Sequence, residues 1–298
     1  MSVLKVGTRG SQMALAQTQA VIDLLLAKQP GLDVRVVQVA TAGDRDQSTA
    51  LSAGSGAGWF TSALQQALLA GEVDIAVHSY KDLPTKRPAG LVIAAVPLRD
   101  DPRDALVSQS NRTLKQLPAG ARIGTGSPRR ETQLLAMRPD IVVVPIRGNV
   151  DTRIRKVREG EYDAIVVALA GLRRLGAEDA ASEIFSVYDL LPAPAQGALA
   201  VECRADDTAT RALLRAIDDP LARRLVTAER TFLATIDAGC AFPAAAYAEE
   251  FGSTLKLHGL LANEGRIVRA KNAGQADAAA GLGRELAHEL MALAGMSR

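Results

Sequence analysis

Short runs of β-branched residues alternate with helical patterns along the first part of this chain, and this alternation limits the possible folds more than any other feature. The runs VLKVG, DVRVVQVA and VDIAVHS are short enough for strands, whereas MALAQTQAVIDLLLA and FTSALQQALLAG repeat apolar residues at helical spacing. The same order returns in RIGTGS, IVVVPIRGN and YDAIVVALAGL, each a strand candidate that breaks at a glycine-containing turn. The pattern predicts an α/β protein whose ligands bind beyond the carboxyl ends of parallel strands.

The rest of the chain follows a different pattern. LLPAPAQGALAVECR, residues 190–204, carries prolines and a glycine before a β-like run and is typical of a crossing between domains. Further on, the helical pattern LARRLVTAERTFLATI precedes strand-like TLKLHGLLA and RIVRAKN and then an alanine-rich helix. This end of the chain suits a small separate α+β domain, and a length of 298 residues fits two or three domains in total.

Composition excludes several classes of protein. A net charge of only +2 does not indicate the broad basic surface that holds nucleic acid. Two cysteines without a CxxC motif, and three histidines, indicate neither a disulfide framework nor a standard zinc site, so we expect a reducing cytoplasm and no metal. No apolar run approaches the roughly 18 residues of a membrane span, so we expect no membrane partner.

The stretch GTGSPRR, residues 124–130, places two arginines at the expected start of a helix. Ser127 is a good N-cap and Pro128 suits the first helical position, so Arg129 and Arg130 should fall in the first turn. They then lie beside the positive end of the helix dipole, which costs stability unless an anion lies nearby.

Other arginines occupy equivalent turns. Any one of them is more often a solvated surface residue, but a set at strand ends favours a ligand with several carboxylate or phosphate groups. The set comprises Arg9 in VGTRGS, Arg147 in PIRGN, Arg153 in the next first turn, and Arg173 and Arg174 after the AGL turn. Nucleotide binding is disfavoured, because neither GxxxxGK[ST] nor a strand-linked GxGxxG is present.

Two further residues are candidates for chemistry. In VDIAVHSYKDLP, a carboxylate at Asp82 beside Lys81 could stabilise a developing cation or move a proton, although a turn aspartate paired with its neighbour is about as frequent. Cys240, in the glycine-flanked loop DAGCAFP, could be an exposed nucleophile or a covalent attachment point. Isolated cysteines are more often inert and buried, which is the interpretation that the apolar run around Cys203 favours.

The chain resembles the porphobilinogen deaminase, or hydroxymethylbilane synthase, family through the order and spacing of HSYKDLP, DDPRDALVS, GTGSPRR, IRGNVDTR, EYDAIVVALAGLRRLG, PAPAQGALAVECR and AGCAFP. The resemblance implies a transferase of tetrapyrrole, porphyrin and heme biosynthesis. Such an enzyme deaminates four porphobilinogen molecules and condenses them head-to-tail into linear 1-hydroxymethylbilane. It also implies a covalent dipyrromethane cofactor, joined by a thioether to Cys240.

The resemblance assigns further roles by motif. Asp82 corresponds to the catalytic carboxylate that contacts pyrrole nitrogens, assists loss of the amine and stabilises the cationic azafulvene. Phe60, which follows a loop without the lysines of many relatives, is a candidate stacking or gating group. The residues that hold cofactor and substrate carboxylates correspond to Arg9, Ser11, Lys81, Arg129, Arg130, Arg147, Arg153 and Arg174, with Thr125 and Ser127 as hydrogen-bonding neighbours. We therefore expect leucine at position 129 or 130 to impair cofactor assembly or elongation and to leave the fold intact.

The family fold implies two α/β domains like those of type II periplasmic binding proteins, followed by a small α+β C-terminal domain. Domain 1 would comprise residues 1–98 and 199–216, with the catalytic aspartate and the N-terminal anion loop. Domain 2 would comprise residues 99–198, with the arginine-rich carboxylate site. Domain 3 would comprise residues 217–298, with the loop of the cofactor-attachment cysteine. A monomer is the family expectation.

Two departures from the family pattern leave alternatives open. LSAGSGAGWF lacks the loop lysines that many relatives carry, with Ala53 and Ala57 at the corresponding places. In GTGSPRR, Gly126 and Pro128 replace a common serine and a common apolar residue. The missing lysines give weight to an inactive paralogue. A non-catalytic binder of small anions is the other alternative, although such a receptor needs neither Asp82 nor Cys240.

Overall fold

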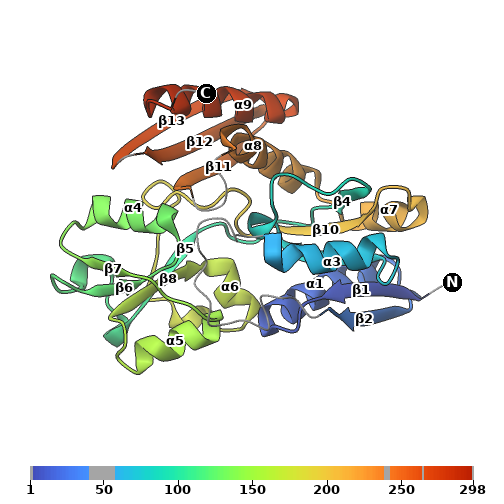
Figure 1. Cartoon of the computed structure of the whole chain (residues 1–298), viewed down its shortest axis with the longest axis horizontal. Helices are drawn as coiled ribbons and strands as arrows, with labels where there is room; N and C mark the ends of the chain where they lie inside the picture. The colour runs from blue at the N-terminus through green and yellow to red at the C-terminus, as the bar shows by residue number, and fades with distance from the viewer. Residues whose placement is uncertain (1–2, 40–57, 238–241, 264, 297–298) are drawn as a thin grey trace. The chain divides into compact units, whose positions relative to one another are not determined.

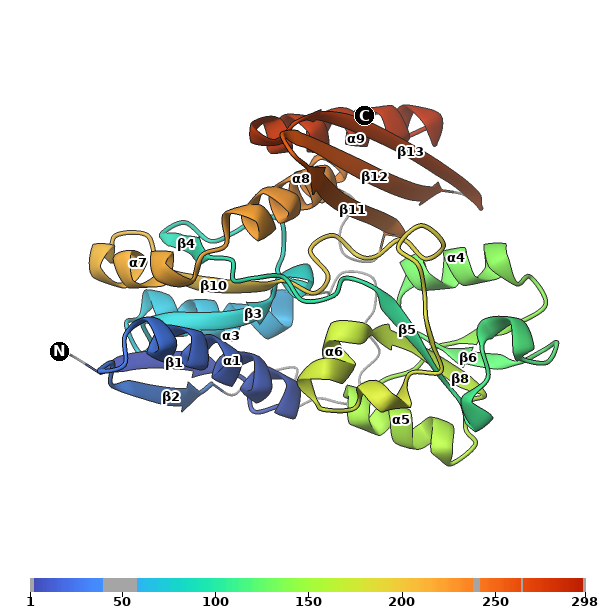
Figure 2. The same ribbon diagram turned by 180° about the vertical axis from the view of Figure 1, so that it is seen from behind.

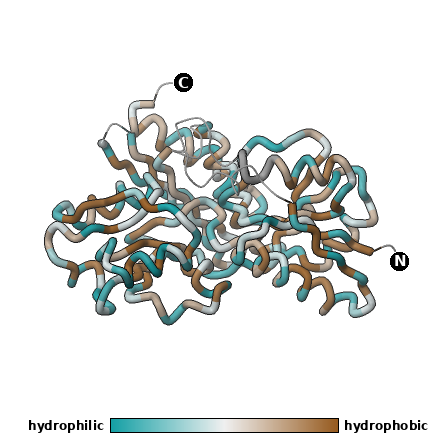
Figure 3. Tube along the Cα trace, turned by 60° about the horizontal axis from the view of Figure 1, so that its bottom comes forward, coloured by the Kyte–Doolittle hydropathy of each residue, from teal (hydrophilic) through white to brown (hydrophobic). Residues whose placement is uncertain are grey.

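The computed structural model describes residues 3–39, 58–237, 242–263 and 265–296, without the side chains of residues 58–62. Within it, the chain divides into two compact units. Unit 1 contains residues 1–99 and 198–223, and unit 2 contains residues 100–197 and 224–298. Hydrophobic stretches alternate with hydrophilic ones along both units (Figure 3).

Unit 1 is built on a five-stranded sheet in the order β2-β1-β3-β10-β4 (Figure 1; β3 is labelled in Figure 2). β1 pairs in parallel with β2 and β3, whereas β10 is antiparallel to β3 and β4. The helix α1 buries Val21 and Leu25 against Val6 and Val77 of the sheet. The strands are β1 Leu4–Thr8, β2 Val34–Gln38, β3 Ile75–Ser79, β4 Leu91–Ala95 and β10 Leu199–Arg204, and the helices are α1 Gln12–Lys28, α3 Gly58–Leu69 and α7 Thr208–Leu214.

The first part of unit 2 repeats this plan with the sheet order β7-β6-β8-β5-β9. β6 is parallel to β7 and β8, and β5 is antiparallel to β8 and β9. Neighbouring residues of a strand point to opposite faces, so Val166 packs with Leu134 of α4 while Ile165 packs with Ile154 of α5. The elements are β5 Asp104–Ser108, β6 Arg122–Gly124, β7 Val142–Val144, β8 Ala164–Ala168, β9 Glu183–Ile184, α4 Pro128–Met137, α5 Val150–Arg158 and α6 Leu169–Arg174.

The C-terminal part of unit 2 is an antiparallel sheet in the order β11-β12-β13 with α9 packed on it (Figure 2). Its core combines Phe232 of α8 with Leu257 of β12 and Leu286 and Leu290 of α9. The elements are α8 Pro220–Ile236, whose first residues belong to unit 1, β11 Ala244–Phe251, β12 Thr254–Asn263, β13 Arg266–Gln275 and α9 Ala279–Leu293.

We predict that Gly283→Ala destabilises unit 2 because α8 and α9 touch at this glycine. A Cβ there would meet the carbonyl oxygen of Ala228 and lie 2.9 Å from the Phe232 nitrogen. Backbone atoms cannot change rotamer to relieve this clash. We therefore expect a loss of about 1–3 kcal/mol in the free energy of unfolding, measured by urea denaturation. The control is Gly281→Ala on the same helix, where a Cβ would meet nothing within 4 Å. That variant should gain up to about 1 kcal/mol of stability, and equal effects at both sites would refute the close-packing argument.

The structure confirms the predicted α/β class with its small α+β C-terminal part, and corrects three details. Both large sheets are mixed, because β5 and β10 run antiparallel to their neighbours. The run predicted to leave β8 through a turn is instead the helix α6, with Arg173 and Arg174 at its end. The alanine-rich β11 was not expected, because alanine favours helices.

Candidate active site

In unit 1, candidate residues gather at one edge of the sheet. Arg9 directly follows β1, and Lys81 and Asp82 lie in a single 3₁₀ turn that follows β3. Because β1 and β3 are parallel neighbours, these positions share the carboxyl edge. Asp82 is exposed, and in the described part of the chain its carboxylate has no hydrogen bond or ion pair, so it is open to a ligand. Ser11 instead caps α1, with its Oγ accepting from Ala14 N at 3.2 Å.

In unit 2, the equivalent edge carries another group of candidates. Thr125 follows β6, Arg147 follows β7 and Arg174 ends the helix after β8, and these three strands are parallel. Arg147 is exposed. Arg153 lies on α5, and its Nε donates to the carbonyl of Gly148 at 2.8 Å.

The helix α4 begins as GTGSPRR predicts. Ser127 is the N-cap residue, Pro128 takes the first helical position, and both arginines fall in the first turn. The side chain of Ser127 makes no capping bond. Thr125 Oγ1 accepts from Ser127 N at 3.2 Å, so Thr125, which is buried, helps to shape the turn.

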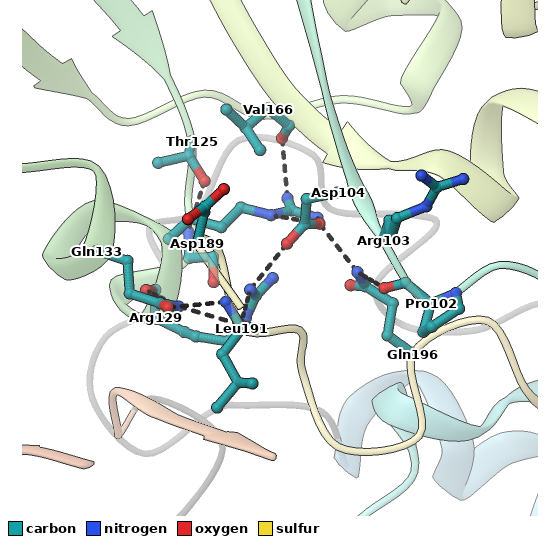
Figure 4. Close-up of polar contacts among 12 residues, drawn as sticks. Pro102, Arg103, Asp104, Thr125, Arg129, Gln133, Val166, Asp189, Leu191 and Gln196 are labelled. Atoms are coloured by element: carbon teal, nitrogen blue, oxygen red, sulfur yellow. Dashed lines mark hydrogen bonds and ion pairs between the residues drawn. The ribbon is translucent and has the colours of Figure 1, made fainter. Parts of the chain in front are cut away.

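The anion that this helix start requires is supplied by the chain itself. Asp104 is the first residue of β5, and because β5 is antiparallel to β8, its start lies at the carboxyl edge of β6 and β8. The Asp104 carboxylate is fully buried and contacts Arg129 Nη1 at 2.8 Å (Figure 4). It also contacts Arg130 Nη2 at 2.6 Å. Gln196 Nε2 donates to the same carboxylate at 2.9 Å.

Charge in this buried cluster does not balance. Burial opposes ionisation of Asp104, but the two guanidinium groups outweigh it and hold the pKa of this carboxyl far below its usual range. Burial lowers the pKa of Arg129, which nevertheless stays charged because a guanidinium titrates far above neutral pH. Two guanidinium groups facing one carboxylate leave a net charge of +1, which favours an additional anion.

Arg129 and Arg130 differ in how many guanidinium donors remain available to a ligand. All three guanidinium nitrogens of Arg130 donate hydrogen bonds, to Asp104 and to the carbonyl of Val166. Within the described residues, Arg129 donates only through Nη1, to Asp104 and to the carbonyl of Leu191 at 2.7 Å. Among the described residues, nothing accepts from Arg129 Nε or Nη2, so these atoms are the available donors of the cluster.

This burial revises one expectation from the sequence. Leucine at position 129 or 130 would leave Asp104 short of a partner in the core, and breaking a buried pair is strongly destabilising. An intact fold is therefore not expected of either leucine variant.

Arg174 is more confined than its motif suggests. Its Nη2 donates to the carbonyl of Gly197 at 2.6 Å, and its Nε lies 3.8 Å from Asp100 Oδ2. Burial lowers the pKa of its guanidinium. The side chain of Arg174 therefore stabilises residues 190–204, the predicted crossing between domains, at Gly197.

Several candidates lie outside the described residues: Cys240, Ala53, Ala57 and the side chain of Phe60. The other cysteine, Cys203, is fully buried on β10, as its apolar run predicts. Burial is the main cause that raises the pKa of its thiol to about 11, so this cysteine is unreactive at neutral pH.

Sequence reasoning missed Asp104, Gln133 and Gln196, all of which are buried. Asp104 pairs with both arginines, Gln133 donates to the carbonyl of Arg129, and Gln196 donates to Asp104. One signal was available for Asp104. An acid at the head of the apolar run ALVS, inside DDPRDALVS, needs a cationic partner if that run is a buried strand.

Comparisons with known proteins cover nearly the whole chain. The family model "Porphobilinogen deaminase, dipyromethane cofactor binding domain" matches residues 4–212, and "Porphobilinogen deaminase, C-terminal domain" matches residues 224–292. The porphobilinogen deaminase of Roseiflexus castenholzii is 48% identical over 295 residues, which is 99% of this chain and 97% of the relative. That of Roseiflexus sp. strain RS-1 is 50% identical over 289 residues, 97% of this chain and 95% of the relative.

Among solved structures, the methionine-binding protein MetQ aligns with a TM-score of 0.47 and 12% identity, over 74% of this chain and 92% of its own. In the part of the chain that the structure describes, no helix is both long and apolar enough to cross a membrane.

Proposed function

Because the chain belongs to the porphobilinogen deaminase family, we propose that the groups at the carboxyl edges of its two large sheets divide that family's chemistry between them. The protein catalyses the deamination and head-to-tail condensation of four porphobilinogen molecules into 1-hydroxymethylbilane, and it uses a dipyrromethane cofactor. Neither a non-catalytic anion binder nor an inactive paralogue gains support from the comparisons.

Asp82 is the proposed catalytic residue, and its open position carries the proposal. The Asp82 carboxylate is exposed in the turn after β3 and has no partner among the described residues, so it can accept hydrogen bonds from pyrrole N–H groups. As ammonia leaves the substrate, the same negative charge stabilises the positive charge that develops on the pyrrole. Lys81 and Arg9, at the same sheet edge, are proposed to hold substrate carboxylates.

The residues of unit 2 fit the cofactor's carboxylates. Each of its two pyrrole units brings an acetate and a propionate, and the buried cluster has a net positive charge with two donors of Arg129 still available. When bound, the cofactor supplies the primer on which condensation starts. The proposed carboxylate-binding residues of unit 2 are Thr125, Ser127, Arg129, Arg130, Arg147, Arg153 and Arg174. In unit 1, Ser11 is proposed for the same role as Lys81 and Arg9, and Phe60 is the proposed stacking or gating group.

The three-domain division, with boundaries at residues 98–99, 198–199 and 216–217, is part of the proposal. The interval between the two family-model matches, residues 212–224, supports the last boundary. We also propose a cytoplasmic protein without a nucleic-acid partner, supported by the net charge of +2 and by two cysteines outside any CxxC motif. A monomer is proposed from the family expectation.

The cofactor attachment is tested by intact-mass measurement. The purified protein should exceed its sequence mass by one dipyrromethane, and Cys240→Ser should lose both the added mass and activity. Cys203→Ala is the matched control and should keep the adduct, because the buried thiol of Cys203 is unreactive. A fully active protein without added mass would refute covalent attachment.

A further inference from the structure

Arg269 on β13 binds the C-terminal sheet to segment 188–191. This segment leads to the buried cluster of Asp104, Arg129 and Arg130. Its Nη1 donates to the carbonyl of Tyr188 at 2.7 Å, and its Nη2 donates to the carbonyl of Asp189 at 3.2 Å. The Tyr188 hydroxyl also donates to Glu249 of β11 at 3.0 Å. Segment 188–191 is therefore bound to two strands of the sheet, β13 and β11. Its last residue, Leu191, contacts the cluster.

Gln133 of α4 joins Arg269 to this cluster. It is only 1% exposed, and each end of its amide has two partners. Its Oε1 accepts from Arg269 Nη2 at 3.1 Å and from Leu191 N at 2.8 Å. Its Nε2 donates to the carbonyls of Arg129 and Leu191, both at 3.1 Å. A buried amide with all these bonds has one orientation, so movement of Arg269 reaches Leu191 and α4.

Leu191 in turn fixes Arg129. The Leu191 carbonyl accepts from Arg129 Nη1 at 2.7 Å, while Asp104 accepts from the same nitrogen at 2.8 Å. Two acceptors on one nitrogen set the plane of the guanidinium and thereby the directions of Nε and Nη2. Arg130 lacks this link, because its main-chain partner is Val166 of β8.

We propose that Arg269 is a positioning residue for Arg129, so that the C-terminal sheet aims the available donors of Arg129 at a substrate or cofactor carboxylate. The inference rests on the proposed role of Arg129. The C-terminal sheet then has a part in holding substrate or cofactor carboxylates, besides belonging to the domain that carries Cys240.

The test compares Arg269→Met with Arg266→Met, an exposed arginine on the same strand, in steady-state kinetics with porphobilinogen. Loss of hydrogen bonds that aim a binding group should raise KM by about three- to tenfold and leave kcat within about twofold. Arg266→Met should stay within about twofold of the wild type in both constants. Adding Arg269→Met to Arg129→Lys should change KM little further, because the aimed group is already altered.

The outcomes separate this inference from the function on which it rests. If Arg129→Lys raises KM but Arg269→Met behaves like Arg266→Met, the positioning role is overturned and the role of Arg129 stands. A lower melting temperature of Arg269→Met with unchanged KM would make Arg269 structural only and would also overturn the inference. If Arg129→Lys leaves both constants unchanged, the proposed role of Arg129 fails and the inference falls with it.

Discussion

Asp82→Asn should lower kcat for porphobilinogen consumption by about 10²- to 10⁴-fold, the range found when a charge-stabilising or proton-transferring group is removed. The amide has the same shape but no negative charge, so it cannot stabilise the cation that develops as ammonia leaves. Because Asp82 is exposed and forms no bond within the described part of the chain, the change should leave the fold unaltered. Initial rates of ammonia release and the melting temperature measure the two effects.

Asp33→Asn is the matched control for this experiment. Asp33 is also exposed in unit 1, but it precedes β2 and therefore lies at the amino edge of the same sheet. It should keep the wild-type rate. A rate for Asp82→Asn that equals that of Asp33→Asn would assign the chemistry to another residue.

Local patterns predicted most elements of the fold because each depends on neighbouring residues. The helical spacing in residues 13–27 becomes α1, and the apolar run in residues 73–79 ends in β3. Strand direction does not follow from such patterns. β10 enters the sheet of unit 1 between β3 and β4, more than a hundred residues after either, and only tertiary pairing sets its antiparallel course. The alanine-rich β11 is likewise a strand because it pairs with β12 and packs on the core.

At the candidate site, too, the sequence predicts local structure but not strand direction. The sequence pattern predicted that Arg129 and Arg130 lie in a first helical turn, and the structure confirms this placement. The anion beside them is Asp104 of the chain itself, whereas the sequence pattern led us to expect carboxylates of a ligand. The identity of the anion depends on the direction of β5, because only an antiparallel β5 brings Asp104 to the start of α4. The roles of Asp82, Cys240 and the individual arginines stay predictions until the variants are measured.

Asp104→Asn should reduce the free energy of unfolding by about 3–5 kcal/mol, the cost of breaking a buried ion pair from one side. Asn keeps the volume but leaves two buried guanidinium groups without a counter-charge. Urea denaturation followed by circular dichroism measures the loss. Asp140→Asn is the control in unit 2, because Asp140 makes a close pair with Arg138 at 2.7 Å but is exposed. It should unfold at nearly the wild-type urea concentration. A similar midpoint for both variants would contradict the structural role of Asp104.

The pH dependence of stability separates loss of charge at Asp104 from loss of packing. The pKa of Asp104 is lower in the folded state than in the unfolded state. The contribution of its charge to the free energy of unfolding is therefore fully present above about pH 4 and is lost as the pH falls toward the folded pKa. In the wild type, the free energy of unfolding should therefore fall with acidification below about pH 4. Asp104→Asn has no proton to take up at this position. The difference in the free energy of unfolding between the wild type and this variant should therefore narrow from pH 4 toward pH 2. If the variant lost stability only through packing, the difference would stay constant across this range.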